Sequence, residues 1–129
     1  MKKVLKTRRF SRWMRKTLLE DKMLCDAVAE MEDGLIDADL GGGVFKKRIA
    51  LPGRGKRGSV RTLIATNRGN RWIFLYGFEK NERDNITNAE LTALQNVADD
   101  FLGFSETLLE QVIASGQLVE VADEEQNIG

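Results

Sequence analysis

The basic side chains in the middle of the chain are the residues best suited to chemistry. Residues 46–83 carry eleven Lys or Arg and only two acidic residues. The candidates that we select from them are Arg54, Lys56, Arg57, Arg61, Arg71 and Lys80. Arginine stays protonated and can contact a phosphate through two hydrogen bonds, whereas lysine can lose its proton when it is buried among other cations. This pattern predicts contact with phosphate groups and stabilisation of negative charge on a reacting phosphate.

The absence of histidine narrows the possible chemistry further. With no histidine and a single cysteine, Cys25, the chain lacks the usual general base and every Ser–His or Cys–His nucleophile. Any catalysis must therefore use Lys, Arg, Tyr, Asp or Glu. The chain offers no histidine or cysteine-based zinc site and no internal disulfide, so we expect neither a metal nor a cofactor. Cys25 lies in an apolar helical stripe and is predicted to pack as a small hydrophobic residue.

The segment Gly53-Arg54-Gly55-Lys56-Arg57-Gly58 has the spacing of a dinucleotide-binding fingerprint. That function requires a helix to begin at the glycines, whereas the residues that follow favour a strand. A phosphate-binding loop of the Walker type is also excluded, because Ser59 stands where a lysine is required. Two interpretations stay open: the loop contacts phosphates through its cations, or it is a solvated hairpin loop.

Three candidates, Arg61, Arg71 and Lys80, lie in or beside predicted strands. A sheet holds side chains more rigidly than a loop, which suits the positioning of a scissile phosphate. The alternative is an exposed sheet face whose charges are satisfied by solvent.

Charge is segregated along the chain although the net charge is zero. Residues 1–16 carry eight bases and no acid, residues 17–45 are acidic, residues 46–83 are basic, and residues 84–129 carry ten acids and no base. Such blocks predict one cationic face and an anionic partner, with nucleic acid the first candidate. The basic N-terminus is either an arm that binds nucleic acid or the solvated face of a first helix.

The apolar pattern predicts helices at both ends and strands between them. Helices are expected over residues 8–33, with a capping box at Thr17–Glu20, over residues 87–101, with a capping box at Thr87–Glu90, and over residues 105–113. Strands are expected over residues 35–40, 44–51, 60–66 and 71–78, joined as an antiparallel meander. The predicted fold is α+β: N-terminal helices packed on a small antiparallel β-sheet, followed by C-terminal helices.

Four aromatic residues alternate in the last predicted strand: Trp72, Phe74, Tyr76 and Phe78. Strict alternation places all four on one face of the sheet. Such a face is more often core beneath helices than a platform on which bases stack.

The length and hydropathy predict one domain over residues 1–129, with residues 117–129 as a frayed tail. No apolar stretch is long enough for a signal peptide or a membrane span, so we expect a cytoplasmic protein without a membrane partner.

Two segments carry a family resemblance: Leu51-Pro52-Gly53-Arg54-Gly55-Lys56-Arg57-Gly58 and Leu75-Tyr76-Gly77-Phe78-Glu79-Lys80-Asn81-Glu82. With these, the chain resembles the RelE/HigB-like toxins of bacterial type II toxin–antitoxin systems. The resemblance implies a RelE-like fold and metal-independent cleavage of mRNA on the ribosome by attack of the ribose 2′-hydroxyl. It also implies a cognate antitoxin, usually with a helix-turn-helix domain.

The resemblance implies roles for the basic residues. We expect Arg61 to stabilise the transition state and Lys80 or Lys56 to transfer a proton. Lys47, Arg54, Arg57 and Arg71 are then expected to bind RNA. Two alternatives stay open: a ParE-like toxin that acts on gyrase by binding, and a catalytically inactive relative that binds RNA or a protein.

Overall fold

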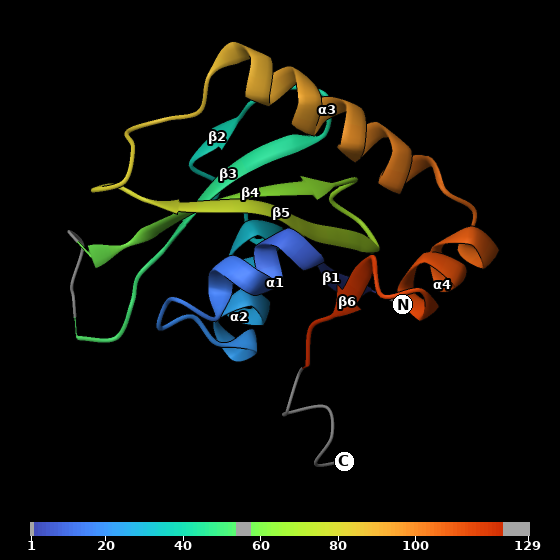
Figure 1. The fold of residues 1–129 in the computed structure, drawn as a ribbon, viewed down its shortest axis with the longest axis horizontal. Helices are drawn as coiled ribbons and strands as arrows, with labels where there is room; N and C mark the ends of the chain where they lie inside the picture. Colours follow the sequence, from blue (N-terminus) through green and yellow to red (C-terminus); the bar gives the residue numbers. More distant parts are fainter. Residues whose placement is uncertain (1, 54–57, 123–129) are drawn as a thin grey trace.

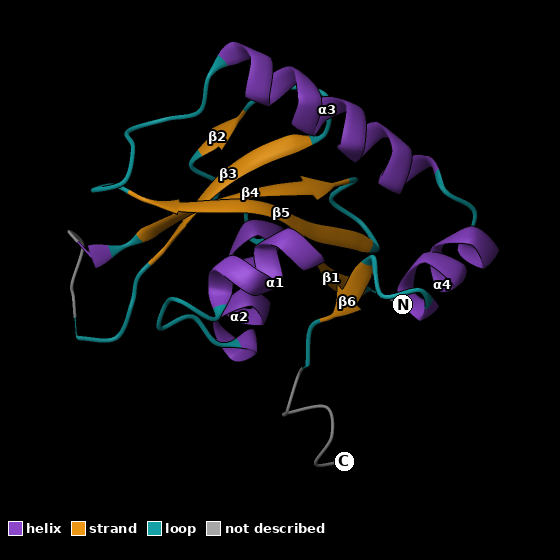
Figure 2. Cartoon of the chain, viewed as in Figure 1, coloured by secondary structure: helices purple, strands orange, loops and turns teal. Residues whose placement is uncertain are grey.

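The fold is taken from a computed structural model, which describes residues 2–53 and 58–122. Its elements are β1 (Lys3–Thr7), α1 (Arg8–Met14), α2 (Asp21–Glu32), β2 (Ala38–Asp39), β3 (Val44–Ile49), β4 (Val60–Thr66), β5 (Arg71–Glu79), α3 (Asn88–Gly103), α4 (Glu106–Ala114) and β6 (Leu118–Glu120). The expected α+β class is confirmed (Figure 1). The helices predicted for the two ends and the strands between them are present (Figure 2).

The expected order of elements is wrong at both ends, because the sheet also contains the first and last elements. Its strand order is β2-β3-β4-β5-β1-β6. Strands β3, β4 and β5 form the predicted meander, but β1 pairs parallel to β5, so the sheet is mixed. Residues 118–120, assigned to a frayed tail from the sequence, pair antiparallel with β1. Both strands were missed because their pairing joins residues far apart in sequence, which local patterns do not show.

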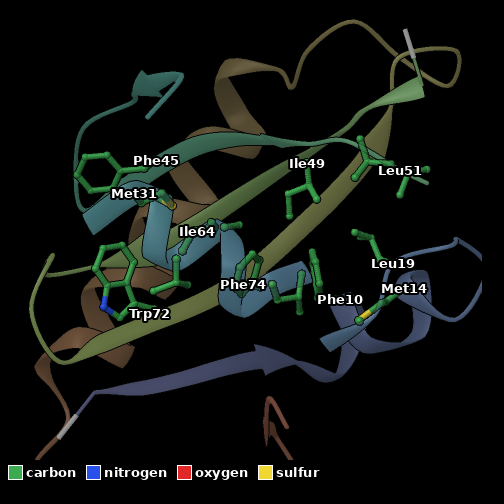
Figure 3. Close-up of a cluster of buried hydrophobic side chains, with 14 residues drawn as sticks. Phe10, Met14, Leu19, Met31, Phe45, Ile49, Leu51, Ile64, Trp72 and Phe74 are labelled. Carbon is green, nitrogen blue, oxygen red and sulfur yellow. The ribbon is translucent and has the colours of Figure 1, made fainter. Parts of the chain in front are cut away.

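Helices cover both faces of the sheet. Helices α1 and α2 bury one face of the sheet, which we call the α2 face, and its core includes Phe10, Met31, Ile64 and Phe74 (Figure 3). Helices α3 and α4 cover the opposite face, which we call the α3 face. No helix in the described part of the chain is long and apolar enough to cross a membrane.

A β-bulge in β5 corrects the predicted alternation of aromatic residues. Leu63 pairs with Tyr76 and Ile64 with Phe74, so Leu75 has no partner in β4. The extra residue reverses the alternation: Phe74 belongs to the core of the α2 face, whereas Tyr76 packs on the α3 face. The four aromatic side chains are therefore divided between the two faces.

One close approach depends on the glycine that follows the bulge. Gly77 lies opposite Thr62 on the α2 face, and the Trp13 indole of α1 covers it. A Cβ atom at this position would lie 2.2 Å from Cζ3 of Trp13. The absence of a side chain at Gly77 thus lets α1 lie flat on β5.

Helix caps were predicted with mixed success. The capping box of α3 is confirmed, since Thr87 and Glu90 exchange both hydrogen bonds. The box predicted at Thr17–Glu20 is wrong, because the N-cap of α2 is Glu20, three residues after Thr17, and it makes no side-chain cap hydrogen bond. The Thr17 hydroxyl instead accepts a hydrogen bond from the Leu19 amide and donates one to the Met14 carbonyl, so it closes a turn.

Candidate functional site

Arg61 is a nearly buried cation near one end of the sheet. It lies in β4 opposite Phe78, which places it on the α3 face, and only 9% of its surface is exposed. Its Nη1 donates a hydrogen bond to the Ser59 carbonyl at 3.2 Å. No carboxylate in residues 2–53 or 58–122 forms an ion pair with it. A buried guanidinium without a counter-ion is costly, so this position suits an anion.

Further cations lie beside Arg61 in the sheet. The register of β3 and β4 places Arg48 directly opposite Arg61, with Lys46 two residues away on the same side of β3. Like charges that face each other across a strand pair are destabilising. We call Lys46, Arg48 and Arg61 the cationic row. An anion bound between these side chains would relieve their repulsion.

The remaining basic candidates lie at the loops of this end. Lys80 directly follows β5 and is exposed. It comes two residues after Phe78, which pairs with Arg61 in the sheet. Arg54, Lys56 and Arg57 lie outside the described residues.

Beyond Phe78, which is paired with Arg61, the next aromatic residue of β5 on this face is Tyr76. It occupies a position diagonal to Arg61, and sheet geometry puts such neighbours about 7–8 Å apart. The Arg9 guanidinium of α1 lies 4.9 Å from its ring centroid. Nη1 of Arg83 donates to its hydroxyl at 3.4 Å. A small cavity of about 90 Å³ opens here, lined by Arg9, Tyr76, Ile86, Glu90, Ala93 and Leu94.

Arg83 and Glu90 tie the loop after β5 to the first turn of α3. Both guanidinium nitrogens of Arg83 contact the Glu90 carboxylate, at 2.8 and 2.5 Å. These bonds, together with one from the Thr87 amide, lower the pKa of Glu90 to about 2. The same pairing, with a smaller contribution from Tyr76, raises the pKa of Arg83. The loop that begins at Lys80 is therefore anchored to the helix.

Lys47 and Arg71 are held by contacts away from the cationic row. Nζ of Lys47 lies on the α2 face, 2.8 Å from the Glu30 carboxylate and 3.0 Å from the Leu35 carbonyl. Arg71 starts β5 near the far end of the sheet, where Nη1 donates to the Phe101 carbonyl at 2.9 Å at the end of α3. For either side chain to bind RNA, these contacts must first be broken.

A larger hollow of about 420 Å³ lies between α2 and the end of β3. Its lining includes Asp26, Glu30 and Arg48, and Glu30 already pairs with Lys47, so the charges of this hollow are mixed. In the described part of the chain, no group of three His, Cys, Asp or Glu side chains is arranged to hold a metal ion.

Comparison with family models assigns the chain to a known family. Residues 2–121 match the family model described as "RelE toxin of RelE / RelB toxin-antitoxin system". The chain belongs to the RelE toxin family. A search of curated proteins found no match. In this RelE-family chain, the matched region contains both helical layers and all six strands of the sheet.

Sequence reasoning missed Lys46 and Arg48 of the candidate site, although a signal was present in β3. The run Lys46-Lys47-Arg48 lies between Phe45 and Ile49, which both face the α2 core. Alternation from these two residues puts Lys47 on the core side and its neighbours on the opposite side. The cluster around Tyr76 had no such signal, because it depends on the bulge and on a contact with α1.

Proposed function

We propose that this RelE-family toxin is a metal-independent endoribonuclease that cleaves mRNA on the ribosome. The observation that carries the proposal is the nearly buried Arg61 guanidinium, which has no carboxylate partner in the described part of the chain. Arg48 faces it across the strand pair. Two arginines held by a rigid sheet suit a phosphate whose negative charge increases during reaction.

In the proposed reaction, the ribose 2′-oxygen attacks the adjacent phosphorus. A bond forms between these atoms, the bond from phosphorus to the 5′-oxygen breaks, and the products are a 2′,3′-cyclic phosphate and a 5′-hydroxyl. The 2′-hydroxyl loses its proton to a base, and the departing 5′-oxygen takes up a proton. Arg61 stabilises the negative charge of the pentacovalent intermediate.

Proton transfer is proposed for a lysine at the same end of the sheet. Lys80 follows β5 directly and starts the loop that Arg83 and Glu90 anchor. Lys56 is the second candidate, and with Arg54 and Arg57 it belongs to the loop outside the described residues. Arg54 and Arg57 are proposed to contact the RNA backbone. For Lys47 and Arg71, RNA contact stays a prediction that requires their present ion pairs to open.

An antitoxin encoded beside the toxin is proposed as the protein partner, with a helix-turn-helix domain as its expected form. The family description supports this partner, since it names a toxin–antitoxin system. A cytoplasmic location is proposed on the same ground, because mRNA and ribosomes are found there.

Induced expression in a bacterial host, followed by growth curves and primer extension on a reporter mRNA, tests the proposal. The wild type is expected to arrest growth and to produce new 5′ ends inside translated codons. Arg61→Gln removes the charge and is expected to lower the cleavage rate roughly 100- to 1,000-fold, as loss of one charge-stabilising donor does. Arg68→Gln is the matched control, because Arg68 is exposed in the turn between β4 and β5.

The alternatives give different results. Growth arrest with intact mRNA would instead indicate a ParE-like toxin acting on gyrase. No arrest would indicate an inactive relative that binds RNA or a protein. Cleavage by Arg61→Gln at the wild-type rate, with equal protein levels, would refute the assignment of Arg61.

A further inference from the structure

The N-terminal helix carries a cationic surface that the proposed reaction does not use. We call this surface the α1 face. Its members are exposed Lys or Arg side chains in α1 and the two residues that follow it: Arg8, Arg9, Arg12, Arg15 and Lys16. Within residues 2–53 and 58–122, none of them forms an ion pair with a carboxylate. Elsewhere the pattern differs: Lys2, Lys3 and Lys6 are all paired.

This arrangement opposes helix stability. Arg8 and Arg12 are four residues apart on the same side of the helix, where like charges repel each other and destabilise the helix. The first turn contains no acidic residue, and its positive charges lie at the end of the helix that favours negative ones. Packing holds α1 in place instead, through Phe10, Met14 and the Trp13 ring over Gly77. Charges that weaken the helix in isolation fit a surface that binds an anionic polymer.

The α1 face is continuous with the candidate site. Strand β1 ends at Thr7, and α1 begins beside β5 at the level of Tyr76. Arg9 lies over the Tyr76 ring, and it lines the same cavity as Glu90. Arg12 is one turn further along the helix, about 5–6 Å away between Cβ atoms. The α1 face thus adjoins Tyr76, which lies diagonal to Arg61 and beside the paired Arg83 and Glu90.

The charges of the remaining helices limit the other paths that an anionic strand could follow. The four acidic residues of α2 are all paired with lysines, whereas α3 and α4 together contain five acids and no base. An anionic strand that leaves the cationic row is therefore disfavoured along α3 and α4 and attracted by α1.

From this we infer that the single-stranded RNA on one side of the scissile phosphate lies along the α1 face, which binds its backbone phosphates. This inference rests on the proposed function, since it extends the same RNA strand beyond the cationic row. It makes Arg8, Arg12 and Arg15 substrate-binding residues without sequence preference. The α1 face then decides how many nucleotides of substrate the toxin holds.

Fluorescence anisotropy with uncleavable 2′-O-methyl oligonucleotides tests the inference on the full-length chain. A core of about four nucleotides is compared with the same core extended by about four nucleotides at either end. We expect extension at one end to strengthen binding to the wild type. The Arg8→Gln/Arg12→Gln/Arg15→Gln variant should bind the core normally and lose that gain.

The size of the effect follows from counterion release. Each single-strand phosphate contact contributes about 0.7 to the slope of log K against log salt, so losing three lowers the slope by about 2. At about 0.1 M salt this corresponds to a 10- to 100-fold weaker complex with the extended oligonucleotide. The matched control, Lys2→Gln/Lys22→Gln/Arg68→Gln, removes three exposed cations from other surfaces and should keep the gain.

Several results would overturn the inference. One is that neither extension strengthens binding to the wild type, and another is that the stronger binding persists in the α1 variant. A third is that the variant loses affinity equally for the core and for the extended oligonucleotide. Unchanged oligonucleotide binding with weaker association to ribosomes would show that α1 contacts ribosomal RNA instead. Arg61→Gln separates the two failures: if it cleaves the reporter mRNA at the wild-type rate, the proposed site is wrong whatever α1 does.

Discussion

Replacement of Gly77 by alanine tests how closely α1 is packed on the sheet. The new Cβ would lie 2.2, 2.5 and 2.6 Å from three carbons of the Trp13 ring, all far inside van der Waals contact. The ring or the helix must therefore move. Such overpacking costs about 1–3 kcal/mol, of which about 0.5–1 kcal/mol is offset because alanine suits a strand better than glycine. We expect the free energy of unfolding to fall by roughly 1–2 kcal/mol.

Urea denaturation followed by circular dichroism measures this change, and thermal melts check it. For a domain of this size, 1 kcal/mol corresponds to a shift in melting temperature of about 3–6 °C. Gly103→Ala is the matched control, because nothing lies within 4 Å of a Cβ added at the end of α3. That change is expected to be neutral or to stabilise by about 0.5–1 kcal/mol.

A double-mutant cycle with Trp13→Ala identifies the cause of the effect. If the indole is what the new methyl group meets, the penalty of Gly77→Ala should disappear when the ring is absent. A Gly77→Ala protein as stable as the wild type, or a penalty that persists in the Trp13→Ala background, would refute the packing argument.

Three further predictions concern ion pairs. Lys47→Ala removes a nearly buried cation held by Glu30, so the free energy of unfolding in urea should fall by about 1–3 kcal/mol. No loss would mean that this contact does not support α2. Arg71→Gln should speed amide hydrogen exchange at the end of α3, whose carbonyls the guanidinium contacts, and unchanged protection there would contradict the role. Glu90→Gln should destabilise the protein only where the carboxylate is charged in the folded state. Its pKa is lowered from 4.5 to about 2, so the stability difference should be constant above pH 4.5 and vanish as the pH falls towards 2. A difference that persists at pH 2 would contradict the Arg83 pairing.

The position of Arg61 gives the charge pattern a physical meaning. A basic sequence segment alone fits either a solvated surface or a binding site. Burial of one arginine without a carboxylate partner in the described part of the chain favours a binding site, because solvated charges need no counter-ion and buried ones do. The same argument does not apply to Lys47 and Arg71, whose burial is compensated by ion pairs.

The sequence by itself narrowed the possible chemistry and determined the central strands. The absence of histidine leaves Lys, Arg, Tyr, Asp or Glu for any reaction, and the basic block over residues 46–83 favours lysine and arginine. Strands β3, β4 and β5 were predicted because β-branched and apolar residues cluster there between turn residues. The cap of α3 was also predicted, because Thr87 and Glu90 interact locally. Such features depend on residues close together in the chain, so local patterns report them.

Only the tertiary structure decided where the charges lie and what surrounds them. The bulge at Leu75 moves Tyr76 to the face of Arg61, and the pairing of β1 with β5 brings Arg9 over its ring. Lys47 and Arg71 look like Arg61 in the sequence, but each forms an ion pair with a carboxylate from another element. These outcomes depend on contacts between distant segments. Their energies are set by packing and burial, which composition and periodicity do not specify.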